Sequence, residues 1–293
     1  MPINFIGKTA GTASGPGLEL VVGRTPTHGR RDDLRAAWRR LWRSNWVRIV
    51  GPLLLLAAWE IAVTWFGVSE LTLSSPRSVA ETAWRLMEDG TLWTALGISL
   101  RRVAIGIAIG VPAGAALALL SGLFSTGERL IDPVVQMLRT MPALAVVPLF
   151  ILWFGIGEEP KVLLVALAVS FPVYINLYAG IRGVDGRLVE AGRVFGLGRF
   201  RLIRDVILPG ALPSFLVGLR FSLGIAWIVL VASEQINATS GLGYMMLNAQ
   251  NLLQTDVIFV GLIVYSLLGL ISDLLVRLLE RWLLSWRHGF RSL

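Results

Sequence analysis

Residues 103–123 read VAIGIAIGVPAGAALALLSGL, a run without a single charged side chain. A helix of this length can cross the hydrocarbon core of a bilayer, which needs roughly 20 mostly apolar residues. Because a backbone in lipid must satisfy its own hydrogen bonds, the run is expected to be helical. Alternation with period two, which would indicate a membrane β-barrel, is absent from the sequence. The segment therefore predicts a membrane-spanning helix.

Five further segments are apolar apart from Arg48, Glu60, Arg220 and Asp273, and together they explain an unusual composition. They are residues 47–66, 141–157, 162–181, 206–233 and 257–276. Of the 293 residues, 55% are hydrophobic and only 16% are charged, whereas a soluble domain carries about 25% charged residues. This composition excludes a soluble protein, and it excludes a disordered one because disordered chains are poor in apolar residues. The sequence predicts an all-α, polytopic membrane protein with six transmembrane helices.

The basic residues predict how these helices are oriented. Of the 27 Lys and Arg residues, 21 lie in four alternate segments, 1–48, 124–140, 182–205 and 274–293. Since basic loops stay in the cytoplasm, both termini and the loop 182–205 are predicted to be cytoplasmic. The net charge of +8 is then a topology signal rather than evidence for nucleic-acid binding. Membrane lipid is the expected surrounding, and no nucleic acid is expected as a partner.

The chain divides into three regions. Residues 1–46 form a basic leader, in which Arg and Trp side chains recur every four residues, as in an interfacial amphipathic helix. Residues 47–280 hold the six-helix transmembrane domain, and residues 281–293 form a cytoplasmic tail. On the outer side, residues 67–100 are expected to form one or two short surface helices, with Ser75-Pro76 at a helix start.

No catalytic or metal-binding pattern occurs in the sequence. Cysteine is absent, which excludes disulfides, thiolate zinc sites and cysteine nucleophiles, and the two histidines lie near the ends. Gly7-Lys8-Thr9 resembles the end of a phosphate-binding loop, but Pro2 stands where that loop needs a glycine. We expect no catalytic residue, metal or cofactor on this chain. Such a protein is either a channel or secondary carrier, or it takes energy from a partner.

The loop after the fourth apolar segment favours a partner. Residues 181–213 read IRGVDGRLVEAGRVFGLGRFRLIRDVILPGALP. One face of an expected short helix carries four apolar residues, Leu188, Ala191, Val194 and Phe195. Gly196 and Gly198 are expected to end this helix, and a second amphipathic run follows at 200–207. A short helix with basic rims is suited to docking in a groove of a cytoplasmic partner.

The same loop resembles the EAA loop of ABC importer permeases that depend on a binding protein. Glu190-Ala191-Gly192, Gly196 and Ile207-x-Pro209 match the family pattern of E-A-A, a glycine four residues later, and I-x-P. Gly192 replaces the usual third alanine, which is a small-for-small change. The resemblance implies a MetI-like ABC importer permease fold whose coupling loop, 182–210, contacts an ATPase subunit. The implied contact residues are Glu190, Ala191, Gly192 and Gly196, together with Arg193 on the basic rim.

Further segments are similar to a narrower group, the permeases for aliphatic sulfonates, taurine and nitrate. The run SGLGYMMLNAQNLLQTD, residues 240–256, is most similar to aliphatic sulfonate permeases. This resemblance implies translocation of a small anion, foremost an aliphatic sulfonate, across the bacterial inner membrane, with taurine or nitrate as alternatives. It also implies the partners: two cytoplasmic ATP-binding subunits that carry ATP and Mg, a second permease copy forming a homodimer, and an extracytoplasmic substrate-binding protein.

Charges inside the membrane are costly, so they mark candidates for the substrate path. Arg220 either pairs with Glu60 or Asp273, or faces the path, where its planar fork would suit an oxyanion. Two arginines at the outer end of the second span, Arg101 and Arg102, either snorkel to lipid headgroups or attract an anionic substrate. Two polar residues of the fourth span complete the candidate path, Ser170 and Tyr174.

Two further features concern packing. Gly106, Gly110 and Gly114 lie on one helix face, which indicates close contact either with another helix of the bundle or with a second copy of the chain. Glu234 ends the fifth span near the outer face. It is expected to cap a helix or to form an ion pair, because a carboxylate repels an anionic substrate.

Overall fold

The computed structural model describes residues 46–65, 69 and 72–285, and these residues form helices and connecting turns without any strand. The chain forms two compact units. The first unit ends at Leu55, halfway along the first described helix, and the second unit begins at Leu56. The predicted interfacial helix of the leader lies outside the described residues, as does the end of the tail.

Four stretches of the described residues are long and apolar enough to cross a membrane. They are α4, α7, α12 and the continuous stretch Arg199–Ile236, and they contain four of the six predicted spans. The helices in chain order are α2 Trp46–Trp65, α3 Pro76–Glu88, α4 Thr91–Leu123, α5 Ser125–Arg139, α6 Val147–Phe154, α7 Glu159–Arg182, α8 Gly186–Val194, α9 Arg199–Leu202, α10 Leu208–Asn237, α11 Leu242–Asn251 and α12 Thr255–Leu283. A 3₁₀ turn covers Ala143–Val146, and a π-helical turn covers Ile203–Ile207.

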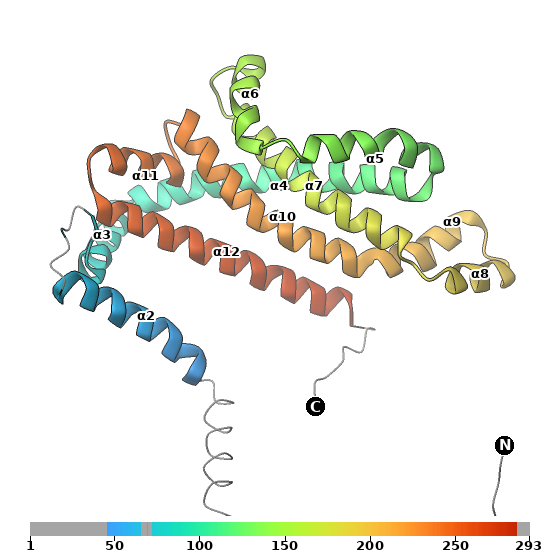
Figure 1. Ribbon diagram of the computed structural model, residues 1–293, viewed down its shortest axis with the longest axis horizontal. Helices are drawn as coiled ribbons and strands as arrows, with labels where there is room; N and C mark the ends of the chain where they lie inside the picture. Colours follow the sequence, from blue (N-terminus) through green and yellow to red (C-terminus); the bar gives the residue numbers. More distant parts are fainter. Residues whose placement is uncertain (1–45, 66–68, 70–71, 286–293) are drawn as a thin grey trace, which may run out of the picture. The chain divides into compact units, whose positions relative to one another are not determined.

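Helix α7 lies between α4 and α10, and α12 packs against α10 (Figure 1). The glycines of α4 face α7 so closely that a β-carbon at Gly106 would lie 2.5 Å from Val165 Cγ1. At Gly110 it would meet the backbone carbonyl oxygen of Ala166, and Gly114 is equally close to α7. This seam joins two helices of one chain, so the prediction of glycine packing within one bundle is confirmed.

Two apolar clusters lie along α7 and form the core. One surrounds Val165 and Val169 in the first half of the helix and includes residues of α4, α10, α11 and α12. The other surrounds Tyr174, Leu177 and Ile181 in the second half and includes residues of α4, α5 and α10. The core therefore holds the long helices together over the full length of α7.

The prediction of a spanning helix over 141–157 is wrong. The structure has the 3₁₀ turn and the eight-residue α6 there, and it has α5 where the sequence predicts a cytoplasmic loop. Pro148 lies in the first turn of α6, where its missing N–H costs no hydrogen bond, and Gly155 with φ +77° follows the last turn. Helix α5 escapes prediction because its apolar residues alternate with charged ones along a short amphipathic helix.

The outer segment differs in part from its prediction. Helix α3 begins as predicted, with Ser75 as N-cap, whose Oγ accepts a 3.1 Å hydrogen bond from the N–H of Ser78. The next helix, α4, starts at Thr91 and runs without interruption into the span. The residues before Val103 therefore belong to the membrane helix, although the charges of Arg101 and Arg102 resemble a helix boundary in the sequence.

Candidate functional site

Helix α8 is the centre of the predicted coupling loop, and its two ends are fixed by local chemistry. The Asp185 carboxylate accepts a 2.9 Å hydrogen bond from the N–H of Arg187 at the start of the helix. At the other end, Gly196 adopts φ +78°, and its N–H donates to the carbonyl of Arg193. The N–H of Leu197 donates to the carbonyl of Gly192, which completes a Schellman motif. Gly196 thus ends the helix as predicted.

The predicted apolar face of α8 is exposed in the described chain. Val194 and Phe195 are each 85% exposed, Leu188 is 58% exposed, and Phe200 on α9 is 76% exposed. The opposite side of the helix is anchored through Gly192, which is buried against Leu202 and Leu197. Because a soluble surface rarely presents several large apolar side chains together, this face indicates a docking surface.

The second amphipathic run, residues 200–207, is continuous with the membrane helix that follows it. Helix α9 passes through the π-helical turn directly into α10, with Pro209 in the first turn of α10. Pro209 cannot donate a backbone hydrogen bond to the preceding turn, and that turn is the π-helical one, where the regular helix bonding is already altered. The coupling segment is therefore one short helix, α8, packed beside the extended end of a membrane helix.

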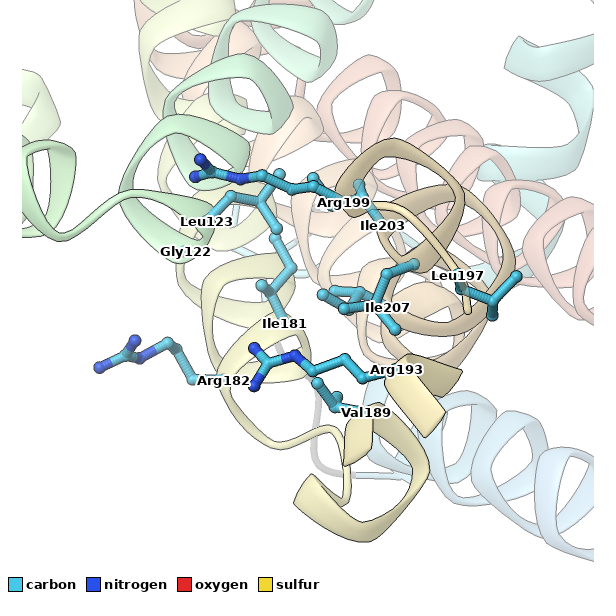
Figure 2. A pocket seen from close by; sticks show the side chains of 11 residues that line it. Gly122, Leu123, Ile181, Arg182, Val189, Arg193, Leu197, Arg199, Ile203 and Ile207 are labelled. Carbon is cyan, nitrogen blue, oxygen red and sulfur yellow. The ribbon is translucent and has the colours of Figure 1, made fainter. Parts of the chain in front are cut away.

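A cavity of about 540 Å³ lies beside α8, between that helix and the ends of α4, α7 and α9. Figure 2 shows its apolar residues with three arginines among them. Arg182 binds the Glu128 carboxylate at 3.0 Å, and the guanidinium of Arg199 lies 5.2 Å from the ring centre of Phe124. Arg193 makes no ion pair within the described part of the chain. Its charge is therefore available to a partner.

The remaining coupling residues are accessible. Glu190 and Ala191 are both exposed. The Glu190 carboxylate has no ion pair with any described residue of this chain. The structure therefore brings Glu190, Ala191, Arg193 and Gly196 onto the exposed part of one loop, while Gly192 supports the loop from its buried side.

A second polar site lies around Arg102, at the end of the bundle that the sequence predicts to face outward. Its guanidinium binds Glu234 at 2.7 Å and contacts both carboxylate oxygens of Glu158 at 2.6 Å. Arg102 is 2% exposed and Glu234 is not exposed at all. Ser99 donates a 2.8 Å hydrogen bond to Glu234, which also accepts one from the N–H of Gly243 at 2.7 Å. The prediction that Glu234 caps or pairs is confirmed.

This outer ion cluster (Arg102, Glu158, Glu234 and Ser99) changes the interpretation of Arg102. Neither predicted alternative describes it, because its side chain reaches neither headgroups nor an open path. Glu158 lies at the start of α7 with its side chain partly in water, and the Arg102 guanidinium holds the pKa of that carboxyl below its usual value. The cluster joins α4, α7, α10 and α11 at the outer end of the bundle.

Sequence reasoning did not identify the partners of this cluster. Glu158 and Arg102 are distant in sequence, and each lies at the edge of an apolar run, which is the only sequence signal they give. Gly241 is a further residue that the structure explains. It adopts φ +110°, and a β-carbon there would collide with the Glu234 carboxylate and lie 2.6 Å from Arg102 Nη1.

The other predicted path residues do not meet in one place. Arg220 pairs with Asp273, which in turn binds Arg277, so the pairing alternative is the one that the structure shows. Tyr174 is buried and donates a 2.9 Å hydrogen bond to Asp132. Ser170 donates to a carbonyl of its own helix, and Arg101 is exposed about three turns after the start of α4 at Thr91.

Long apolar helices, a cluster of buried ion pairs around Arg102 and an exposed apolar helix face on α8 together define a class. In the described residues no group of three or more His, Asp or Glu side chains could hold a metal ion. The class is a polytopic helical membrane protein.

Comparison with known proteins agrees with this class. The family described as "Binding-protein-dependent transport system inner membrane component" matches residues 106–285. A putative aliphatic sulfonates transport permease protein of Escherichia coli K12 is 48% identical, over 82% of this chain and 91% of the relative. The corresponding protein of Bacillus subtilis 168 is 43% identical, over 85% and 91%. A taurine transport system permease protein of Escherichia coli K12 is 37% identical, over 87% and 94%.

A solved structure shares the fold at much lower sequence identity. A chain of an amino acid ABC transporter crystallised with histidines superimposes with a TM-score of 0.56 at 21% identity, over 67% of this chain and 96% of that one. The chain belongs to the family of binding-protein-dependent transport system inner membrane components. It is a permease subunit of an ABC importer and a multi-pass protein of the bacterial inner membrane, not an enzyme.

Proposed function

We propose that this permease translocates aliphatic sulfonates. The observation that carries the proposal is the similarity, over more than four fifths of the chain, to two putative aliphatic sulfonate permeases from distant bacteria, at 48% and 43% identity. Taurine is the second candidate, because the taurine permease is 37% identical over a similar length. Both solutes carry a sulfonate group, so the shared chemistry is recognition of that anion.

We further propose that α8 couples the permease to a cytoplasmic ATPase. The exposed face of Leu188, Val194, Phe195 and Phe200 offers apolar contact, and Glu190 and Arg193 offer charges at its edge. The ATPase would carry ATP and Mg²⁺, and the permease itself would carry no cofactor. Docking of an apolar helix face into a groove is an established mode of recognition, and the residues at its centre dominate the affinity.

The assembly that supports this function has two permease copies, two ATPase subunits and an extracytoplasmic binding protein. Each permease would contribute six membrane-crossing segments, with α5 and α6 together replacing one simple helix, and both termini in the cytoplasm. Arg101 is exposed about three turns after the start of α4, where its charge would attract an anion entering the path. Among the other predicted path residues, Arg102, Tyr174 and Arg220 already have partners, and we assign them to support of the bundle rather than to contact with substrate.

The proposal predicts that Glu190→Lys abolishes uptake of an alkanesulfonate. Cells lacking this gene are complemented with the wild-type or the variant permease, and uptake of radiolabelled butanesulfonate is measured with co-purification of the ATPase subunit. Reversing the charge at the edge of the docking face should weaken the complex, because a lysine there would face the group that complements Glu190, and like charges opposed across an interface cost several kcal/mol. Both uptake and co-purification should fall together.

The matched control is Glu280→Lys, which makes the same change at an exposed glutamate near the end of α12. Its uptake should equal that of the wild type. Unchanged uptake and assembly in Glu190→Lys would refute the coupling role. If the wild-type gene restores taurine uptake but no uptake of butanesulfonate, the aliphatic sulfonate assignment is wrong.

A further inference from the structure

A second cavity lies within the membrane-spanning part of the bundle. It has a volume of about 680 Å³ and is bordered by α5, α6, α7 and α10. Its walls are almost entirely apolar, with Phe150, Trp153, Leu164, Leu167 and Phe171 among them. The volume falls within the range of about 300–1,000 Å³ typical of sites for small molecules. We call this cavity the mid-membrane groove.

Arg139, the last residue of α5, is the one charged side chain among the described residues that line the groove. It is exposed and forms no ion pair with any described residue. The sequence places Arg139 in a cytoplasmic loop, where an unpaired arginine is unremarkable. The structure removes it from that loop, because α5 is a helix that carries Arg139 away from the basic end of the bundle.

The depth of Arg139 follows from the pairing of α5 with α7. Glu128 binds Tyr178 and Arg182 at 2.8 and 3.0 Å, and Asp132 binds Tyr174 at 2.9 Å, so the two helices run antiparallel. Continuing along α5 brings Arg139 level with Leu167, which lines the same groove. At 1.5 Å per residue, Leu167 lies about 12 Å from the outer end of α7 and about 22 Å from Arg182. Arg139 therefore lies in the hydrocarbon region.

An unpaired arginine at this depth is costly and is retained where it meets an anion or water. A guanidinium presents a planar fork of donors that suits the oxygens of an oxyanion. The groove extends along α7 from Leu164 to Ile175, about 16 Å of helix, which accommodates an alkyl chain of several carbons. The site thus combines an anion-binding head with an apolar slot for a tail.

We propose that the mid-membrane groove is a transient binding site for alkanesulfonates, with the sulfonate on Arg139 and the alkyl chain between Trp153 and Phe171. This inference rests on the proposed function and specifies where and how that substrate is held. No acidic side chain occurs among the described residues of the groove. The ammonium group of taurine would therefore lose water there without gaining a partner, and the groove discriminates against taurine.

The test compares Arg139→Gln and Arg139→Lys in the complete transporter, with its ATPase and binding protein. Uptake of butanesulfonate, hexanesulfonate and taurine is measured. Arg139→Gln should reduce uptake of both alkanesulfonates by about tenfold to a hundredfold, the equivalent of one charge-assisted hydrogen-bonded contact. Arg139→Lys should retain more activity because it keeps the charge without the fork. Arg129→Gln, at an exposed arginine near the other end of α5, is the control and should match the wild type.

A second measurement detects occupancy directly. The chain has no cysteine, so Met141→Cys gives a single thiol at the groove. Hexanesulfonate should slow its labelling by a neutral maleimide, and hexyltrimethylammonium, which has the same chain and the opposite charge, should not. The protection should disappear in Arg139→Gln.

The outcomes separate this inference from the proposed function. If Arg139→Gln takes up alkanesulfonates as fast as the wild type, the groove site is wrong, whereas the proposed function stands. The same conclusion follows if the anionic and cationic probes protect Met141→Cys equally. The latter result would mean that the groove holds any apolar chain, for example from lipid. Absence of alkanesulfonate uptake in the wild type would overturn the proposed function itself.

Discussion

At the scale of single residues, the carboxylate of Glu234 has the most demanding environment in the described chain. It is fully buried, and it is compensated by Arg102, the Ser99 hydroxyl and the N–H of Gly243. A buried charge is tolerable only when its partner and its remaining lone pairs are satisfied in this way. The three contacts come from α4 and α11, so a single side chain on α10 connects three elements.

We predict that Glu234→Gln destabilises the protein by about 3 kcal/mol, the lower end of the range for removing one partner of a buried ion pair. The lower end applies because Glu158 still neutralises Arg102. The readout is the apparent melting temperature of the purified permease in lipid nanodiscs. Glu81→Gln is the matched control, because Glu81 pairs with Arg77 in water on α3, and its melting temperature should be unchanged. Equal melting temperatures for Glu234→Gln and the wild type would refute the structural role.

Residue-level prediction succeeded where the chemistry was local and failed where it depended on distant partners. The end of α8 at Gly196 and the start of α3 at Ser75 follow from residues a few positions away. Arg102 could not be assigned, because Glu158 and Glu234 approach it only after three helices have packed. Arg139 was missed for a related reason, since its depth depends on α5 being a helix beside α7.

At the scale of elements, the glycine seam determines how closely α4 and α7 approach. We predict that Gly110→Ala lowers stability by about 1–3 kcal/mol, the usual cost of overpacking, because its methyl group would meet the backbone of Ala166. Gly97→Ala is the control on the same helix, since a β-carbon there has nothing within 4 Å. Thermal unfolding of the two variants should differ clearly. If they unfold at the same temperature, the seam is not closely packed.

Helices that are apolar along most of their length could be predicted from the sequence. The short amphipathic helix α5 and the interrupted run 141–157 could not. Four apolar runs form long helices even though three of those helices contain an interior proline, namely Pro112, Pro172 and Pro213. Membrane helices tolerate such prolines because neighbouring groups satisfy the freed carbonyls. The run 141–157 has the same hydropathy, but Pro148 and Gly155 set the two ends of a short helix within it. The neighbouring helix α5, which carries charged residues, would supply the rest of the membrane-crossing segment. Hydropathy alone therefore places the boundaries of the predicted span wrongly.

At the scale of the whole molecule, the distribution of arginines predicts which loops face the cytoplasm. Because the chain has no cysteine, single cysteines can report the side of each loop. We predict that Val194→Cys on α8 is labelled by a membrane-impermeant maleimide only after permeabilisation, and that Asn251→Cys at the end of α11 is labelled in intact spheroplasts. The permease is expressed without the ATPase subunit, so the face of α8 stays uncovered, and both side chains are exposed within the chain. Labelling of Val194→Cys in intact spheroplasts would invert the proposed topology.

The continuous rod from α9 through α10 has a thermodynamic consequence. It extends over Arg199–Ile236, 38 residues or about 57 Å, from the side of α8 to the Glu234 carboxylate. A rigid element that contacts two sites makes their binding free energies interdependent, and such coupling is reciprocal. If nucleotide binding by the ATPase changes the affinity of the outer face for its loaded binding protein by some factor, that binding protein must change nucleotide affinity by the same factor. The supply of solute would therefore change the nucleotide affinity of the ATPase, just as nucleotide binding changes the permease.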